Sequence, residues 1–278
     1  GTPIKIISGD KEQTVTVSTE WTGEQSYLAG AAVMTIYGDV RQFDCSGNGA
    51  KITGLDASYN TQLTLLNCGS DSIKSLDISR NTRLMNLRCY DNRLTLLDVS
   101  KNTELEWIYC YKNALTALDL RYNARLKWLF CYENALTSLD VSKCTQLEWL
   151  YCADNPISTL DISHNKHLNT LYCYGNNFTT AALDDIYCSL PDRKGKSKGD
   201  IAPLLNASSV DKSKVLATNG NNAAVRGWKA IYYEGNSEIT GFTGTHQCGG
   251  GTGIDEAKDS PSLAVYPNPV KDVLNIAT

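Results

Sequence analysis

The sequence is poor in several features that mark catalytic or membrane proteins. It has only three histidines, His164, His167 and His246, which are too few for most metal or acid–base sites. No run reaches the roughly 18 apolar residues that a membrane-spanning helix needs. The net charge is only −4 over 278 residues. Neither sign dominates, so the charge does not indicate nucleic-acid binding. With 42% hydrophobic and 20% charged residues, the composition is that of an ordinary globular protein.

Motifs for catalysis are also missing. The glycine-rich run Gly249 to Gly253 is not followed by Lys-Ser or Lys-Thr, so it is predicted to be a linker and not a phosphate-binding loop. No Ser or Cys stands in a nucleophile-elbow setting. His164 and His167 lie three residues apart with no third ligand in sight, which argues against zinc. We therefore predict that the protein is not an enzyme and binds no metal or cofactor.

The ten cysteines reveal a repeat. Seven of them are separated by gaps of 23 and then five times 21 residues, at Cys45, Cys68, Cys89, Cys110, Cys131, Cys152 and Cys173. A fixed period of this size is typical of a solenoid, in which each coil buries its apolar face against the next. The other three cysteines, Cys144, Cys188 and Cys248, lie outside this series.

The unit that contains each cysteine has a recognisable pattern. Leu84-x-x-Leu87-x-Cys89-x-x-Asn92-x-Leu94 recurs 21 residues later and resembles the leucine-rich-repeat consensus, with Cys in one usual Leu position. The resemblance covers about residues 40 to 178. An offset half-copy within each unit, Leu94 to Asn102, resembles the nested 21-residue repeats of bacterial surface proteins and implies a second short strand in each coil.

Strand alternation predicts which side chains face the core. Leu87 and Cys89 point inwards while Arg88 points outwards, and on the second strand Leu97 and Val99 point inwards. Neighbouring parallel strands hold the stacked cysteines at roughly the strand spacing, which is wider than the ~3.8 Å between Cβ atoms that a disulfide prefers. The seven cysteines are therefore predicted to be small apolar core residues.

The expected fold is an α/β repeat solenoid, mostly β, with a leucine-rich-repeat coil stack, a parallel concave sheet, a β-rich N-terminal cap and a mixed C-terminal cap. The predicted segments are an N-terminal β cap (1–39), the repeats (40–178), a C-terminal cap (179–242), a linker (243–262) and a tail (263–278). Strands are expected at 4–7, 13–19, 32–37, 200–205 and 228–233, a helix at 180–190, and a turn or short helix at 211–227. Cys188 and Cys248 could pair if the protein is exported, or could remain free.

The tail carries a second resemblance. Tyr266-Pro267-Asn268-Pro269, followed by a strand-like alternation, resembles the start of a type IX secretion sorting domain over about 14 residues. This resemblance implies a secreted or cell-surface protein associated with the outer membrane. The alternative is a Pro-rich tail that leads into an edge strand.

Aromatic residues gather at the outward positions of the first strand. Three columns of positions, three residues before, one before and one after each cysteine, hold 11 of the 24 aromatic residues of the chain. Together with one arginine they form the predicted ligand-binding set: Arg88, Tyr90, Trp107, Tyr109, Tyr111, Trp128, Phe130, Tyr132, Trp149, Tyr151, Tyr172 and Tyr174. Exposed rigid rings mark interaction surfaces, and a rim of Asp91, Lys112, Glu133 and Asp154 favours that interpretation.

Two functions fit these columns. A binding module would dock a protein or glycan partner on the concave face, whereas a structural spacer or adhesin stalk would use the rings only to stabilise the sheet. We predict the binding module, acting without a nucleic-acid partner or a transmembrane segment.

Two polar columns complete the repeat. The carboxylates of Asp56, Asp77, Asp98, Asp119, Asp140 and Asp161 could form a calcium ladder, but the glycine-rich turns of calcium-binding coils are absent, so caps on turn N–H groups are favoured. The asparagines Asn92, Asn113, Asn134, Asn155 and Asn176, with a second set at Asn60, Asn81, Asn102, Asn123 and Asn165, are expected to satisfy backbone groups inside the turns. Cys144 replaces an asparagine of the second set.

Overall fold

The computed structural model describes residues 2–8, 10–17, 33–37, 40–48 and 52–248. Most of the predicted linker and the whole tail with the Tyr-Pro-Asn-Pro motif lie outside these residues. Residues 1–248 belong to one compact unit, and the description below concerns this unit alone.

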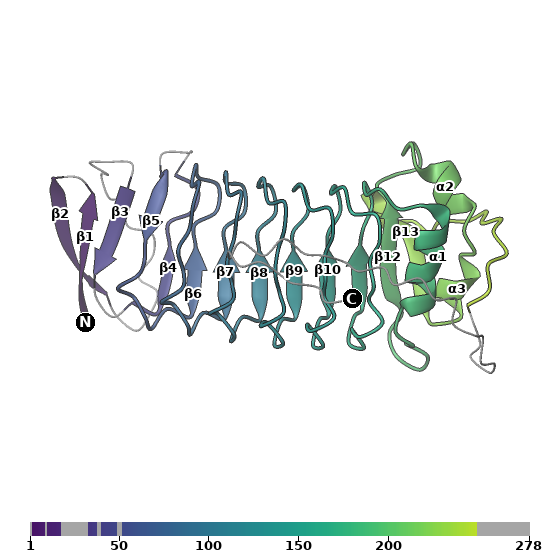
Figure 1. Ribbon diagram of the computed structural model, residues 1–278, viewed down its shortest axis with the longest axis horizontal. Helices are drawn as coiled ribbons and strands as arrows, with labels where there is room; N and C mark the ends of the chain where they lie inside the picture. The colour runs from purple at the N-terminus through teal and green to yellow at the C-terminus, as the bar shows by residue number, and fades with distance from the viewer. Residues whose placement is uncertain (1, 9, 18–32, 38–39, 49–51, 249–278) are drawn as a thin grey trace, which may run out of the picture. The chain divides into compact units, whose positions relative to one another are not determined.

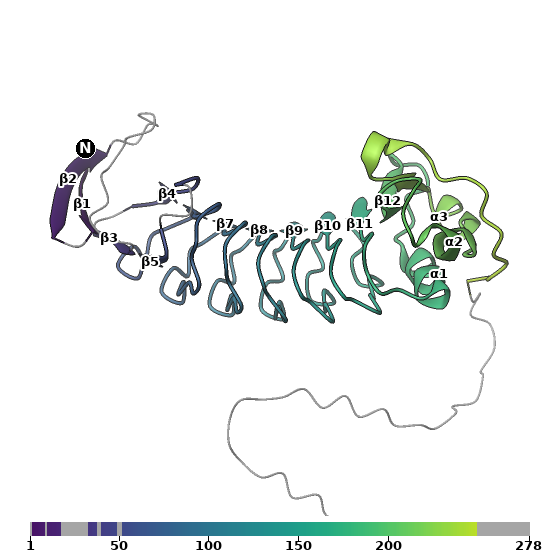
Figure 2. The same ribbon diagram turned by 90° about the horizontal axis from the view of Figure 1, so that it is seen from above.

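One long parallel sheet runs through the repeat region (Figure 1). Its strand order is β13-β12-β11-β10-β9-β8-β7-β6-β4, and successive coils pair in register, for example Leu87 with Ile108. The repeat strands are β4 (Gln42–Asp44), β6 (Leu65–Asn67), β7 (Asn86–Arg88), β8 (Trp107–Tyr109), β9 (Trp128–Phe130), β10 (Trp149–Tyr151) and β11 (Thr170–Tyr172). Figure 2 shows these strands lined up along one side of the coils, with the turns on the other. The predicted coil stack is confirmed.

The interior is built from the inward positions of each coil. The central residue of each strand from β6 to β11, such as Ile108 or Leu129, is completely buried, and so are the leucines of the turns, such as Leu94 and Leu115. In the first strand, β4, the central Phe43 is only partly buried. The seven cysteines of the repeat are buried and free of disulfides, and burial raises the pKa of Cys110 to about 12. The prediction that they pack as small apolar residues is confirmed.

An inner asparagine ladder joins each coil to the one before it. The Asn113 side-chain amide donates to the carbonyl oxygens of Cys89, Cys110 and Tyr111 at 3.0, 3.1 and 3.3 Å. Its Oδ1 accepts from the Leu94 N–H at 2.9 Å. The same four bonds recur at Asn134 and Asn155, so the predicted role of these amides in satisfying backbone groups is confirmed.

The second strand predicted in each coil forms only in the first coil, as β5 (Gly54–Asp56), and the prediction is wrong for the later repeats. Leu97 and Val99 are buried and Asp98 is exposed, as the alternation requires, but the ladder is reduced to an isolated bridge between Asp56 and Asp77. The cause is competition for the backbone groups. The Val99 carbonyl accepts from the Asn102 N–H and from the Asn123 side chain of the next coil, so it is not available to a neighbouring strand.

A second asparagine ladder therefore holds this corner. The Asn102 side-chain amide donates to the Ile78 and Asn81 carbonyl oxygens at 3.0 and 2.8 Å, and Asn123 repeats the pattern one coil later. At Cys144 only a thiol contact of 3.9 Å to the Leu120 carbonyl remains. Cys144 is completely buried, which agrees with its predicted role as a small substitute.

Replacing Cys144 with asparagine should therefore stabilise the protein by about 1 kcal/mol. It adds two hydrogen bonds to the corner ladder at about 1 kcal/mol each, but it also buries an amide oxygen that, like those of Asn123 and Asn165, has no hydrogen-bond partner. We expect thermal unfolding to shift upwards by about 2–4 °C. Cys144→Ala serves as the control, since it removes the thiol without adding a donor. A lower melting temperature for Cys144→Asn than for Cys144→Ala would show that this ladder does not stabilise the coil.

The aspartate column caps the turns beside this corner. The Asp98 carboxylate accepts from the Ser100 N–H at 2.9 Å, and the same bond forms at Asp77, Asp140 and Asp161. Hydrogen bonds from the serine hold the pKa of Asp98 below its ordinary value. The turn-capping interpretation of this column is confirmed.

A smaller sheet precedes the repeats, with the order β2-β1-β3-β5. β1 (Thr2–Ser8) pairs antiparallel with both β2 (Lys11–Val17) and β3 (Val33–Tyr37), and β3 pairs parallel with β5 (Gly54–Asp56). The switch from antiparallel to parallel pairing connects the cap to the coils, as the predicted β-rich N-terminal cap requires.

The C-terminal cap mixes helices with two strands that extend the parallel sheet. Its elements are α1 (Thr180–Ser189), β12 (Gly199–Leu204), α2 (Lys212–Leu216), α3 (Asn221–Ala224), β13 (Trp228–Tyr232) and the 3₁₀ turn η1 (Glu234–Asn236). The Thr179 hydroxyl accepts from the Ala182 N–H and so caps α1. Figure 1 shows the helices gathered at the end of the coil stack.

A disulfide joins Cys188 of α1 to Cys248, which decides between the two states left open for these cysteines. The segment before Cys248 is held on the cap, since the Gly244 N–H donates to the Thr218 carbonyl and the Asn219 and Asn222 side chains donate to the His246 carbonyl. These first residues of the predicted linker are therefore fixed to the cap.

Candidate functional site

The aromatic rings of the repeats form one continuous surface on the outer side of the sheet. We call this surface the aromatic face: Tyr90, Trp107, Tyr109, Tyr111, Trp128, Phe130, Tyr132, Trp149, Tyr151, Tyr172 and Tyr174. In-register parallel pairing, such as Trp107 with Trp128 and Tyr109 with Phe130, aligns the rings in columns. The predicted side chains are thus brought together.

Neighbouring rings stack along these columns. The ring centroids of Tyr90 and Tyr111 are 4.8 Å apart with planes at 8°, and those of Tyr111 and Tyr132 are 4.4 Å apart with the same small angle. Tyr109 stacks on Phe130 at 4.9 Å. The tryptophans are less uniform, since Trp128 stacks on Trp149 but meets Trp107 edge to face.

Stacking determines which parts of the rings a ligand can reach. A ring inside a column has both faces covered by its neighbours, so it offers its edge and, for tyrosine, its hydroxyl. Burial raises the pKa of Tyr109 and Tyr111 above the ordinary value, so both hydroxyls remain neutral donors at physiological pH. The face therefore presents apolar edges and hydrogen-bond donors together.

Two predicted ligand-binding residues are not accessible. Tyr151 is 8% exposed and Tyr174 is 5% exposed, so the expectation that all three columns lie open is wrong at this end. Their hydroxyls are 2.5 Å apart, and Ala202 and Ile231 of the C-terminal cap pack with them. Here the cap covers the last coils.

Tyr233 belongs to the same cluster and was missed by the sequence reasoning. Its ring centroid lies 5.4 Å from that of Tyr151, 5.2 Å from Tyr172 and 5.1 Å from Tyr174. It follows β13 and lies outside the 21-residue period, so no repeat position pointed to it. The only signal was its place at the end of the predicted strand 228–233.

Charged residues border the aromatic face on the side where the strands end. Asp91, Lys112, Glu133 and Asp154 all have φ between 51° and 53°, the left-handed region that favours glycine. Gly47 and Gly175 take the equivalent place in other coils, also with positive φ. The side chains of Lys112 and Glu133 approach to 4.0 Å, so the predicted rim is present.

Arg88 lies at the N-terminal end of the face. Its guanidinium is 5.2 Å from the centroid of the Tyr109 ring, within the range of a cation–π contact. Its Nε donates to the Asn86 side chain at 3.2 Å. These contacts fix the position of Arg88 while leaving its charge without a carboxylate partner among the described residues.

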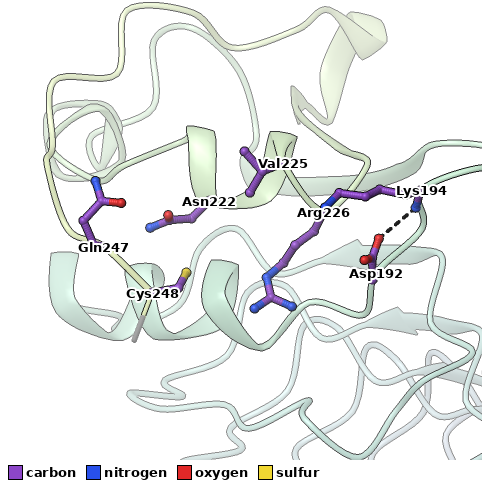
Figure 3. Close-up of a pocket in the computed structure, with 7 residues that line it drawn as sticks. All are labelled: Asp192, Lys194, Asn222, Val225, Arg226, Gln247 and Cys248. Atoms are coloured by element: carbon purple, nitrogen blue, oxygen red, sulfur yellow. Dashed lines mark hydrogen bonds between the residues drawn. The ribbon is translucent and has the colours of Figure 1, made fainter. Parts of the chain in front are cut away.

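The C-terminal cap also contains a cavity (Figure 3). It has a volume of about 340 Å³ and is lined by Asp192, Lys194, Asn222, Val225, Arg226, Gln247 and Cys248. The Lys194 backbone N–H donates to Asp192, Arg226 donates to the Leu190 carbonyl, and Cys248 is in the disulfide. The lining gives no nucleophile and base pair.

The described residues contain no group of three or more potential metal ligands. His164 is exposed, and its nearest polar partner is the Ser163 hydroxyl at 3.2 Å. Within the same part of the chain, no helix has the length and apolar character needed to cross a membrane.

Several solved structures are similar to this chain, whereas no protein-family model and no curated protein matches it. A functional domain of InlJ from Listeria monocytogenes, which includes a cysteine ladder, is 25% identical with a TM-score of 0.47 over 69% of this chain and 43% of that one. A leucine-rich-repeat protein of Leptospira interrogans is 21% identical with a TM-score of 0.46 over 51% and 42%. The internalin InlF of Listeria monocytogenes is 23% identical with a TM-score of 0.44 over 53% and 50%. The chain thus spans half or less of the length of each of these proteins.

Proposed function

We propose that the protein is a non-enzymatic binding module of the cell surface or the extracellular space, and that the aromatic face binds a protein partner. The observation that carries the proposal is the in-register set of 11 rings on one side of the sheet, all of which except Tyr151 and Tyr174 are accessible. Rigid aromatic side chains provide contact area at low entropic cost and are enriched in binding hot spots. The proposed contact residues are the accessible rings from Tyr90 to Trp149 together with Tyr172 and Arg88.

The ring arrangement favours a protein over a glycan. Sugars bind best on an open ring face, but the faces of Tyr111 and Tyr132 are covered by their stacked neighbours. Ring edges with hydroxyls suit the apolar side chains and backbone carbonyls of a polypeptide. Glycan binding is the alternative that the experiment below includes.

The disulfide supports placing the protein outside the cytoplasm. Disulfides form and persist in oxidising compartments and are rare in cytosolic proteins, and Cys188 and Cys248 are bridged. The resemblance of the tail to a type IX sorting domain points the same way. We therefore propose a secreted or outer-membrane-associated protein.

A structural spacer or adhesin stalk is the second candidate. The stacking of Tyr90, Tyr111 and Tyr132 favours it, because ring pairs across strands stabilise a sheet by roughly 0.2–1 kcal/mol each. Stabilisation alone does not account for the charged rim, where Lys112 and Glu133 occupy a backbone conformation that glycine adopts more easily.

The test compares the full chain with the double variant Trp128→Ala/Tyr109→Ala on a library of displayed random peptides and on a glycan array. We expect the wild type to enrich peptides and the double variant to weaken their binding at least about 30-fold, the effect of losing a hot spot of about 2 kcal/mol. Tyr122→Ala is the matched control, since Tyr122 is 52% exposed and lies in the corner turns. Equal peptide affinities for the wild type and a folded double variant would contradict the proposal, and enrichment of glycans alone would replace the protein partner by a sugar.

A further inference from the structure

We propose that the partner segment is a polypeptide with an acidic side chain at one end of the contact and a basic side chain at the other. The acidic side chain pairs with Arg88, the basic one pairs with Glu148 or Asp154, and apolar side chains lie between them. This inference rests on the proposed function of the aromatic face. It adds the chemistry and the direction of the partner, which the rings alone do not define.

The middle of the face is electrically balanced by its own residues. Lys127 lies 2.8 Å from the Glu106 carboxylate on the side where the strands begin. On the opposite side Lys112 lies 4.0 Å from Glu133. A partner therefore meets paired charges on both sides of β8 and β9, and the rings between these pairs determine binding there.

The charges that lie against the rings at the two ends of the face are of opposite sign and make no ion pair. Among the described residues Arg88 has no carboxylate partner, and neither Glu148 nor Asp154 has a cation partner. Asp91, also at the Arg88 end, is exposed on the rim and accepts a hydrogen bond from the Ser70 hydroxyl. Glu148 is half-buried beside Trp149, where β10 begins, and Asp154 follows the end of β10. A charge next to apolar rings interacts more strongly with a partner's charge than one surrounded by water.

Asp154 is exposed, yet partial desolvation and the neighbouring Glu133 carboxylate raise its pKa above the ordinary value. A cation near Asp154 would oppose both effects. The Arg88 guanidinium, in contrast, already lies 5.2 Å from the centroid of the Tyr109 ring. It can therefore donate hydrogen bonds to a partner's carboxylate while it keeps that contact. Complementary charges at the two ends set the register of a partner.

The sheet geometry fixes how far apart the partner's two charges must lie. Arg88 is on β7, and its register partner on β10, three strand steps or roughly 14 Å away at about 4.8 Å per step, is Tyr151. Glu148 and Asp154 lie three residues before and after Tyr151, about 10 Å along the strand, so either carboxylate is roughly 17 Å from Arg88. An extended segment covers this distance in about five residues at ~3.3 Å each, and a helix in about eleven at ~1.5 Å each. Beyond β10 the cluster around Tyr233 buries Tyr174, and only Tyr172 of the face stays accessible there, so both charges of the segment are expected between β7 and β10.

The experiment uses displayed random 12-residue peptides selected on the full wild-type chain and on the charge-swapped chain Arg88→Glu/Glu148→Lys/Asp154→Lys. We expect the wild-type peptides to carry an acidic and a basic residue at one of these two spacings around apolar residues. The charge-swapped chain should select peptides with the two charges exchanged, and should bind the wild-type peptides more weakly by on the order of tenfold. The control Arg83→Glu/Gln146→Lys alters charge in the corner turns, where both side chains are exposed, and should leave the selected peptides unchanged.

The outcomes separate this inference from the proposed function. If both chains select the same peptides, and these peptides still require Trp128, the charge complementarity is wrong while the aromatic face remains the binding site. If the selected peptides do not require the rings, or no peptide is enriched on either chain, both statements are overturned. Circular dichroism melting curves verify that the charge-swapped chain is folded before peptides are selected.

Discussion

Replacing Asp71 with asparagine should raise the free energy of unfolding by about 2–4 kcal/mol at pH 7.5 and change it little at pH 4. Asp71 lies three residues after Cys68, the place that Asn92 and Asn113 occupy in the following coils. It is only 6% exposed, and its carboxyl oxygens have no well-aligned hydrogen bond, only weak contacts from the backbone N–H groups of Ile52 and Asn48. Aspartate thus interrupts the inner asparagine ladder.

The physical reason is a mismatch of donors and acceptors. Asn92 donates to the carbonyl oxygens of Cys68, Cys89 and Tyr90, whereas an ionised carboxylate at position 71 has no proton to donate to the equivalent oxygens. Burial raises the pKa of Asp71 to about 6, and the nearby backbone N–H groups of Ile52 and Asn48 offset only part of this rise. An unsatisfied buried charge lowers stability.

The sign of the pH dependence follows from this raised pKa. The native state holds the proton of Asp71 up to about pH 6, while the unfolded chain releases it near pH 4. The wild type therefore loses stability as the pH rises from about 4 to about 6, by about 2–3 kcal/mol for a shift of about two units. Asparagine does not titrate, so the Asp71→Asn variant should lack this loss.

Urea unfolding of the two proteins at pH 4 and pH 7.5 measures the difference. We expect the stabilisation by Asp71→Asn to grow with pH and to level off above about pH 7. Asp98→Asn is the control, because Asp98 is exposed and its pKa is lowered, not raised. A stabilisation that is the same at both pH values would mean that the charge of Asp71 is not what weakens this coil.

The reverse change in the middle of the stack, Asn134→Asp, should cost about 4 kcal/mol or more at pH 7.5. Asn134 donates to the carbonyl oxygens of Cys110, Cys131 and Tyr132 and accepts from the Leu115 N–H. Aspartate keeps the acceptor but replaces the donor with charge next to three carbonyl oxygens. Part of the loss should be recovered at pH 4, where the protonated carboxyl group can donate one bond.

Thermal and urea unfolding of Asn134→Asp and Asn134→Ala distinguish these contributions. Alanine removes all four hydrogen bonds without adding charge, so its cost should be independent of pH, whereas the cost of aspartate should fall towards pH 4. If aspartate cost less than alanine at pH 7.5, the carboxylate would be solvated there, which would contradict a closed ladder at Asn134.

The 21-residue period allowed much of this fold to be predicted. The register of β7 to β11 and the burial of the cysteines follow from alternation around Leu87 and Cys89, because a repeated coil has to place equivalent residues in equivalent surroundings. The second strand of each coil could not be predicted correctly. Its residues alternate as a strand requires, but asparagines of the next coil, such as Asn123, bind the carbonyl groups that a ladder needs.

The 21-residue period also allowed part of the candidate site to be predicted. The ring columns are repeat positions, so their alignment could be read from the sequence, but the contact between the last coils and the cap could not. Tyr151 and Tyr174 are buried because Tyr233 and Ile231, which follow no period, pack on them. The position of Asp71 could be found from the sequence by extending the asparagine column one coil towards the N-terminus. Aspartate there has an oxygen in place of the NH₂ group of asparagine, so the ladder loses its donor.

Hydroxyl-radical footprinting of the full chain, with and without the tightest displayed peptide, tests most directly whether the aromatic face binds the partner. Oxidation of each tryptophan and tyrosine is measured by mass spectrometry. We predict that the peptide protects Trp107, Trp128, Tyr109 and Tyr111 while oxidation of the exposed Tyr122 stays unchanged. Protection of Tyr122 or of the cap cavity, with the rings of the face oxidised as in the free protein, would contradict a binding role for the aromatic face.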